Sequence, residues 1–96
     1  MITKKQVLKK MEENKDQLKT FKVKKIGLFG SVLKGNQKKN SDIDILVDFK
    51  EVSFDNYAET LMFLEDLFRK RIDLATIKSL RPELNYVKKE AEYARI

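Results

Sequence analysis

Ser41-Asp42-Ile43-Asp44-Ile45-Leu46-Val47-Asp48-Phe49 is the stretch that decides the fold, because aliphatic and acidic side chains alternate along it. Side chains two residues apart on a strand project from the same face of a sheet, so this alternation predicts a half-buried strand. One face of it carries four apolar side chains, Ile43, Ile45, Val47 and Phe49. The other face carries Asp42, Asp44, Leu46 and Asp48, which places two carboxylates, Asp42 and Asp44, side by side on a rigid element.

Helices and strands alternate along the chain on both sides of this strand. Apolar residues at helical spacing, Val7, Met11, Leu18 and Phe21, predict an amphipathic helix from residue 3 to about 20. Strands are predicted at 23–29 and 72–76, with a short helix at 31–34 between the first two strands. Ser53 is the expected N-cap of a helix whose apolar stripe is Phe54, Tyr57, Leu61, Leu64 and Phe68. A last helix is expected to begin at Arg81-Pro82-Glu83 and to end at about Tyr93.

This order predicts an α/β (α+β) fold with a small mixed sheet of about three strands flanked by helices. At 96 residues we expect a single domain, residues 1–96. The polar N-terminus and the lack of a long apolar run predict no secretory signal and no contact with a membrane, and hence a cytoplasmic protein. The net charge of +6 comes from scattered lysines, which favours solvated helix faces over a nucleic-acid groove and also suits a polyanionic ligand such as a nucleotide.

The residue types that are missing narrow the chemistry. The chain has no cysteine and no histidine, so thiol nucleophiles and zinc sites built on thiolates are excluded. A general base must be a carboxylate, a lysine or a tyrosine. A metal site must use oxygen ligands, which favour Mg²⁺, Mn²⁺ or Ca²⁺ over zinc or copper.

Gly30-Ser31 lies between the strand at 23–29 and the short helix that follows it. A glycine at such a turn exposes backbone N–H groups, and the serine hydroxyl adds a donor, so the turn is a candidate phosphate site. The alternative is an ordinary turn capped by serine. Gly30 and Gly35 have the spacing of a P-loop, but Asn36-Gln37 stand where that motif needs Lys and Ser/Thr, so this is not a Walker A site.

Asp73 is the third candidate carboxylate. Its neighbours Ile72 and Leu74 are apolar, so Asp73 is expected on the outer face of its strand. If this strand lies beside the one at 43–49, Asp73 can approach Asp42 and Asp44, and three carboxylates there suit metal-assisted attack on a nucleoside triphosphate. A salt bridge to Arg71 or a nearby lysine is an equal alternative.

The chain resembles the active-site signature of the DNA polymerase beta nucleotidyltransferase superfamily. The resemblance rests on Gly30-Ser31, ten intervening residues, Asp42-x-Asp44 and the later Asp73. Four segments resemble its minimal nucleotidyltransferase branch in order and spacing: Ser41–Val47, Leu64–Leu67, Arg71–Leu74 and Leu80–Ala91. The resemblance covers roughly residues 20 to 96. One departure is Leu33-Lys34, where the family often has Ala-Arg; lysine keeps the charge but not the bidentate fork for phosphate.

The resemblance implies transfer of AMP from ATP to a hydroxyl, with release of pyrophosphate. Asp42, Asp44 and Asp73 would be the catalytic residues and the ligands of Mg²⁺, two ions in all, with Mn²⁺ an alternative. Gly30, Ser31 and Lys34 would bind the nucleotide. Small members of the branch are commonly antitoxins paired with HEPN-type ribonuclease toxins, some of which are adenylylated on tyrosine, so the leading hypothesis is a protein adenylyltransferase of this kind, working as a homo- or hetero-oligomer.

Two alternatives stay open at this point. The chain can neutralise its partner by binding alone, with a weak or vestigial site, and the change to Lys34 leaves room for that. Transfer to RNA or to a small molecule such as an aminoglycoside is less favoured, because the phenylalanines mostly occupy expected core positions instead of clustering with basic residues. The preferred nucleotide and the modified hydroxyl are not encoded in any motif.

Overall fold

A mixed four-stranded sheet organises the chain, in a computed structural model that describes residues 1–96. The strands are β1 (Val23–Phe29), β2 (Ile43–Phe49), β3 (Ile72–Thr76) and β4 (Glu92–Tyr93). Their order across the sheet is β3-β2-β1-β4. β2 runs parallel to β3 and antiparallel to β1, so the condition under which Asp73 can approach the acids of β2 is met.

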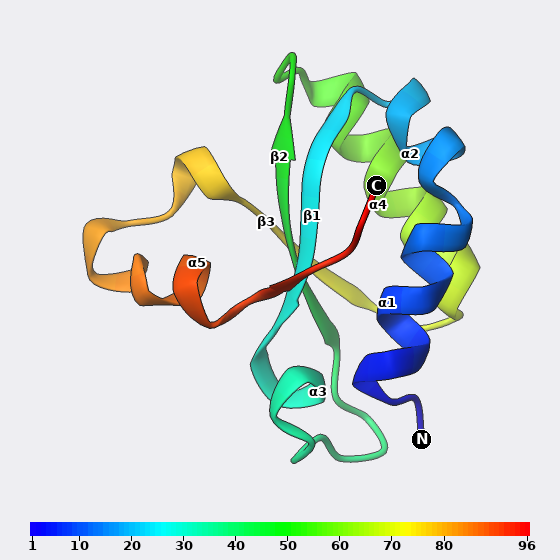
Figure 1. The fold of residues 1–96 in the computed structure, drawn as a ribbon, viewed down its shortest axis with the longest axis vertical. Helices are drawn as coiled ribbons and strands as arrows, with labels where there is room; N and C mark the ends of the chain where they lie inside the picture. The colour runs from blue at the N-terminus through cyan, green and yellow to red at the C-terminus, as the bar shows by residue number, and fades with distance from the viewer.

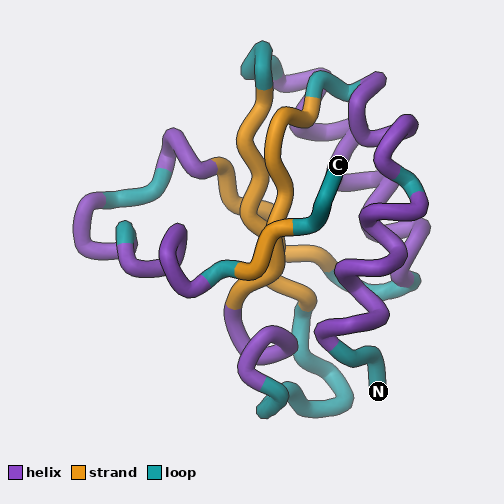
Figure 2. The backbone as a smooth tube through the Cα atoms, viewed as in Figure 1, coloured by secondary structure: helices purple, strands orange, loops and turns teal.

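The helices are divided unequally between the two faces of the sheet. α1 (Lys4–Glu13), α2 (Lys15–Thr20) and α4 (Phe54–Phe68) lie on one side, at the right of Figure 1. On the other side lies the C-terminal segment, which contains the 3₁₀ turns Ile77–Ser79 and Pro82–Leu84 and the short helix α5 (Tyr86–Glu90). α3 (Gly30–Lys34) follows the end of β1 directly. Figure 2 shows that this other side consists of short helical pieces joined by short loops.

The main core fills the space between the sheet and the three longer helices. Val7, Met11 and Leu18 meet Ile43 and Ile45 there, and all five are completely buried. Burying a side chain of this size stabilises a fold by about 1.5–3 kcal/mol, so this layer holds the sheet rigid from behind. The alternation along β2 and most of the predicted helical stripes are thereby confirmed.

Phe54 is the exception to the predicted stripe of α4. It is 81% exposed because it is the first residue of the helix, whereas Leu64 and Phe68, further along, are buried. Ser53 is the N-cap as predicted, and its hydroxyl accepts a hydrogen bond from the Asn56 N–H.

The N-terminal helix is broken where the sequence predicts continuity. α1 ends at Asn14, whose side-chain amide donates to the Lys10 carbonyl at 2.8 Å, and α2 starts at the next residue. Asparagine competes for backbone carbonyls in this way, which is why it often ends helices. The apolar repeat survives the break, since Met11 and Leu18 on either side of it are both buried.

The predicted last helix is also wrong in its ending. It stops at Glu90, and Glu92–Tyr93 form a fourth strand beside β1, where the Ala94 N–H donates to the Ile26 carbonyl. Gly27 makes this pairing possible, because a β-carbon there would come within 2.7 Å of the Tyr93 ring. The space that Gly27 leaves beside β1 is therefore filled by Tyr93 of β4.

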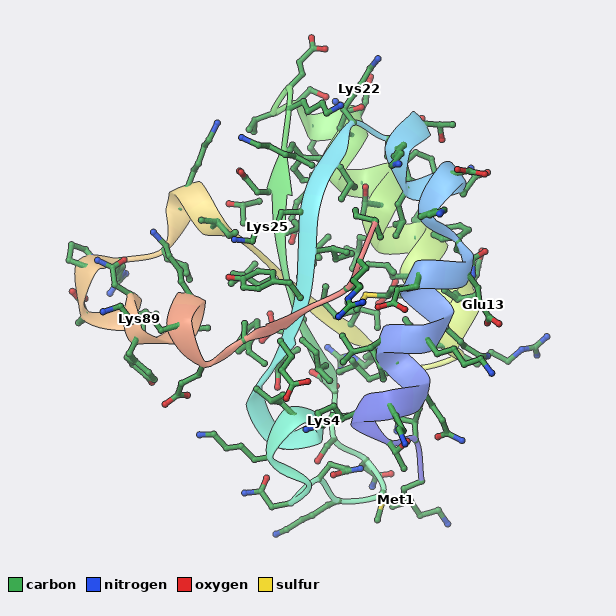
Figure 3. All side chains as sticks on the ribbon, in the orientation of Figure 1. Met1, Lys4, Glu13, Lys22, Lys25 and Lys89 are labelled. Carbon is green, nitrogen blue, oxygen red and sulfur yellow. The ribbon has the colours of Figure 1, made fainter.

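The surface agrees with the scattered charge in the sequence. Figure 3 labels Lys4, Lys22, Lys25 and Lys89 at four well-separated places on the molecule. Lys25 lies over the Tyr93 ring at 4.1 Å, and Lys4 pairs with Glu92 at 3.0 Å. None of the helices has both the length and the apolar character that crossing a membrane requires.

Candidate functional site

The sequence motifs converge where β1 ends and the parallel strands β2 and β3 begin. Asp44 lies opposite Phe29 on β1 and opposite Asp73 on β3. Gly30 and Ser31 follow Phe29 directly. Since Ile43 and Ile45 are buried in the main core, Asp44 projects from the other face of the sheet, which is the face the three longer helices leave open.

Gly30 and Asp44 fit each other closely. Gly30 has φ +74°, in the left-handed region that favours glycine, and a β-carbon at this position would overlap the Asp44 carboxylate oxygen Oδ2. The Ser31 backbone N–H also faces this carboxylate and lowers the pKa of Asp44. The glycine of the motif is therefore required by the carboxylate that follows it in the sequence.

Asp44 and Asp73 form a carboxyl pair close enough to share a hydrogen bond. Burial, followed by the charge of Asp73 and the hydrogen bond to it, raises the pKa of Asp44 to about 6, against the effect of Ser31. Asp44 is partly buried, and Asp73 is exposed. Two acids held this close repel each other when both are ionised.

Asp42 is near this pair but does not complete it. Its charge also raises the pKa of Asp44. Its side chain, however, borders a separate polar hollow, together with Lys39, Lys70 and Arg71. No three acidic side chains gather closely enough to hold one ion as the chain stands. The predicted cluster of three is thus present as a pair with a third carboxylate beside it.

A larger hollow of about 370 Å³ opens next to the pair. Its walls come from the ends of β1 and β3, from α3 and from the C-terminal segment. The residues that line it are Phe29, Gly30, Lys34, Asp73, Ala75, Leu80, Leu84, Tyr86, Val87 and Glu90. Six of these ten are apolar, so the hollow combines an apolar wall with a charged end beside Asp73.

Lys34 contributes the cation of this hollow. It lies in the last turn of α3, and its Nζ is 4.0 Å from a Glu90 carboxylate oxygen of α5. This contact links the two walls across the hollow. It is exposed and long, so it adds little to stability, and a phosphate could take its place.

The C-terminal lining was missed in the sequence. Leu84 and Tyr86 were read only as part of a helix, yet both are exposed, Tyr86 by 55%. Their neighbour Val87 is buried with Ala91 against Leu46, on the same face of β2 as Asp44. An apolar Leu46 among acids on one strand face was the available signal that something covers that face.

A family model described as a nucleotidyltransferase domain matches residues 4–96. The chain belongs to this nucleotidyltransferase family. The match spans both the carboxyl pair and the C-terminal segment that lines the larger hollow, and the chain is a nucleotidyltransferase.

Relatives and solved structures agree with this assignment. The protein adenylyltransferase MntA of Thermococcus cleftensis is 39% identical over 83 residues, 84% of each chain. A solved structure provisionally identified as a minimal nucleotidyltransferase superposes with TM-score 0.81, at 27% identity over 95% of each chain. A toxin–antitoxin structure with AMP-PNP matches 85% of this chain and 70% of its own with TM-score 0.67, at 26% identity. These matches confirm the nucleotidyltransferase-like fold, with four strands where about three were predicted.

The carboxyl pair is chemically suited to a hard divalent cation. Asp44 and Asp73 offer carboxylate oxygens, which Mg²⁺ and Mn²⁺ prefer, and burial, followed by the charge of Asp73, raises the pKa of Asp44. The basic side chains nearest the site belong to the two hollows, Lys34 in one and Lys39, Lys70 and Arg71 in the other. A cation at the pair is the natural way to offset the repulsion.

Proposed function

We propose that residues 1–96 form one minimal nucleotidyltransferase domain that transfers AMP from ATP to a hydroxyl of a partner protein, with Mg²⁺. The single observation that carries this proposal is the contact of Gly30 with Asp44 and of Asp44 with Asp73. The Gly30-Ser31 turn, our candidate phosphate site, lies directly against this carboxylate pair, which supports the proposal. A nucleotide whose phosphates are bridged by metal needs both at once.

The carboxylates would hold the ions. Asp44 and Asp73 already face each other, and Asp42 would join them by rotating about its side-chain bonds away from the polar hollow. Asp44 and Asp73, joined by Asp42, would hold Mg²⁺, which would supply positive charge to offset the negative charge that develops on the phosphates. Two ions suit three carboxylates better than one, and Mn²⁺ would replace Mg²⁺ with the same ligands.

The larger hollow would take the nucleotide. Gly30 would offer its backbone N–H and Ser31 its hydroxyl to the phosphates, while the Ser31 N–H stays with Asp44, and Lys34 lines the same hollow. The apolar wall formed by Leu80, Leu84 and Val87 suits the face of a base. We propose that the phosphates draw Lys34 away from Glu90, because a phosphate is a stronger partner for the ammonium group than a carboxylate 4.0 Å away.

The reaction follows from this placement. The acceptor oxygen forms a bond to the α-phosphorus as the bond from that phosphorus to the bridging oxygen of pyrophosphate breaks. The hydroxyl proton goes to a carboxylate, and Asp73 is the accessible one, since it is exposed and lines the hollow. Asp44 is more buried and holds the geometry.

The acceptor is proposed from the relatives. MntA of Thermococcus cleftensis is named a protein adenylyltransferase, and the AMP-PNP structure is of a toxin–antitoxin pair. The family resemblance adds a HEPN-type toxin as the partner and a tyrosine as the hydroxyl. We propose that this chain is the antitoxin of such a pair. The exposed side chains of Leu84 and Tyr86, at the edge of the nucleotide hollow, are where the partner would approach.

A second candidate is neutralisation by binding alone. The position of Asp42, which lines a separate hollow and forms no three-acid cluster with Asp44 and Asp73, favours it, because a site with two ligands binds metal more weakly than one with three. The two candidates differ in whether anything covalent happens to the partner.

One experiment separates them. The chain is mixed with the HEPN-type protein encoded beside it, Mg²⁺, and ATP labelled on either the α- or the γ-phosphate. Nucleotidyl transfer puts the α-label on the partner and leaves the γ-label in pyrophosphate. No label from either ATP, in a complex that still blocks the toxin's ribonuclease activity, would contradict the proposal and support binding alone.

A further inference from the structure

β3 is an edge strand, so one of its two sides has no neighbouring strand. Along a strand, successive peptide groups point to opposite sides. The Arg71 carbonyl accepts a hydrogen bond from the Ile43 N–H of β2, so the peptide groups of residues 71 and 73 face β2. Those of Ile72 and Leu74 must then face the free side. Asp73, the exposed acid of the site, lies between these two.

Two side chains of α4 occupy that free side. The Tyr57 hydroxyl donates to the Leu74 carbonyl at 2.6 Å, and the Ile72 N–H donates to Glu65 Oε2 at 3.4 Å. The first is a short, strong hydrogen bond, and the second is at the long end of the range. Together they satisfy one free backbone group on each side of Asp73, the Ile72 N–H and the Leu74 carbonyl. An edge strand without such partners would be free to fray or to pair with another chain.

We propose that Tyr57 and Glu65 are positioning residues for Asp73, which hold its backbone from the helix side so that its carboxylate stays opposite Asp44. The inference rests on the proposed function, since it assigns these residues to the metal-binding pair. Asp73 is then fixed from two directions. β2 holds its own peptide groups, and α4 holds those of its neighbours.

The electrostatics support the same assignment. Burial, and then the charge of Asp73, raises the pKa of Tyr57 above its ordinary value. The phenol therefore stays protonated and remains a donor at neutral pH.

The segment Leu64–Leu67, which resembles the minimal nucleotidyltransferase branch, contains Glu65, the acceptor for the Ile72 N–H. Leu64 is completely buried and fixes the rotation of α4 against the sheet. With that rotation fixed, Glu65 points to the start of β3, and Tyr57, two turns earlier on the same helix, points to residue 74. α4 thus packs against the core with one face, and its side chains Tyr57 and Glu65 hydrogen-bond to the edge of β3.

The test uses the affinity of the full chain for Mn²⁺, followed by electron paramagnetic resonance without nucleotide or partner. Tyr57→Phe removes one hydroxyl and is expected to weaken Mn²⁺ binding about tenfold, as the loss of an outer-shell partner commonly does. Glu65→Met should weaken it less, because its hydrogen bond is longer, and Glu65→Gln, which keeps an acceptor oxygen, should restore it. In the labelling assay, kcat should fall while the KM for ATP stays unchanged.

Tyr93→Phe is the matched control. It also removes a phenol-to-carbonyl hydrogen bond, from Tyr93 to the Lys88 carbonyl at 2.9 Å, but at the other edge of the sheet. Its Mn²⁺ affinity should equal that of the wild type. Equal Mn²⁺ affinities for Tyr57→Phe and Tyr93→Phe, whether both unchanged or both weakened, would overturn the inference.

The remaining outcomes separate the inference from the proposed function. If the wild type binds no Mn²⁺, the proposed function fails and the inference falls with it. If Tyr57→Phe weakens Mn²⁺ binding as expected but no partner is labelled, the inference stands and the proposed acceptor is wrong.

Discussion

One face of the sheet packs against the core, and the other carries the candidate site. The face toward α1, α2 and α4 is closed and apolar, with Ile43 and Ile45 completely buried. The opposite face carries Asp44 and Asp73, a hollow of about 370 Å³ and only short segments of cover. Both faces belong to the same strands, whose residues alternate between them. We therefore expect that stability and transfer activity can be altered separately, by substituting neighbouring residues of one strand that project to opposite faces.

Asp44→Asn should give the largest effect on the open face. It removes a carboxylate from the pair, so nucleotidyl transfer should fall by about 10³-fold or more, while the fold persists because Asp44 makes no core contact. The measurement is labelling of the partner, with circular dichroism as the check on folding. Activity within a few-fold of the wild type would place the reaction elsewhere.

Ile45→Ala is the opposite substitution, one residue further along β2. Its side chain is completely buried, so truncation should lower the free energy of unfolding by about 2–5 kcal/mol. Residual activity per folded molecule should stay close to that of the wild type. Urea denaturation gives the first quantity, and labelling at low temperature gives the second. A loss of activity in a fully folded Ile45→Ala chain would break the division between the faces.

Gly30→Ala tests how closely the turn and the pair are packed. Both Gly30 and Gly35 have φ +74°, but a β-carbon at Gly30 would overlap Asp44, whereas nothing lies within 4 Å of one at Gly35. Both variants should lose about 1 kcal/mol from backbone strain. Only Gly30→Ala should also lose transfer activity, by roughly 10²-fold, because it displaces a carboxylate. Equal activities for the two variants would show that contact with Asp44 is unimportant.

The smallest effect is the pH dependence of stability without metal. The pKa of Asp44 is raised to about 6 in the folded chain and is near 3.8 when unfolded, so the folded state holds its proton more tightly. Stability from this group is therefore highest below pH 4 and declines as pH rises to about 6. Asp44→Asn removes that decline, and because the carboxyl is partly exposed we expect a gain of only about 1 kcal/mol at pH 7.

The difference in thermal midpoint between wild type and Asp44→Asn, followed from pH 4 to 8 in a chelator, measures this effect. Asp48→Asn, on the same face of β2 but outside the pair, is the control. Saturating Mg²⁺ should reverse the sign at neutral pH by stabilising the wild type alone. A difference that does not change with pH would contradict the coupling between Asp44 and Asp73.

Local patterns in the sequence were enough to predict β1, β2 and β3 and the face of the sheet on which each acid lies. Alternation along residues 43–49 is a property of neighbours, and so is the helical repeat through Val7, Met11 and Leu18. β4 was missed because a two-residue strand has no pattern of its own. It forms through the contact of Tyr93 with Gly27, which are far apart in the chain.

The candidate site, too, was only partly predictable from local patterns in the sequence. Its carboxylates and its turn follow from spacing, but whether they bind metal or nucleotide is still a prediction. Asp42 shares a polar hollow with Lys39, Lys70 and Arg71, which come from two separate loops, and spacing along the sequence does not predict that grouping. The part played by Tyr57 depends on how α4 packs on β3, and periodicity alone assigned that residue to the core stripe.

The central claim is that the carboxylates on the open face direct AMP onto a partner protein. Intact-mass spectrometry of the HEPN-type partner, after incubation with this chain, ATP and Mg²⁺, tests it most directly. We predict that the partner gains one or more adenylates with the wild-type chain, and none with an Asp42→Asn, Asp44→Asn double variant that still binds it. Adenylates added equally by the double variant would contradict the account.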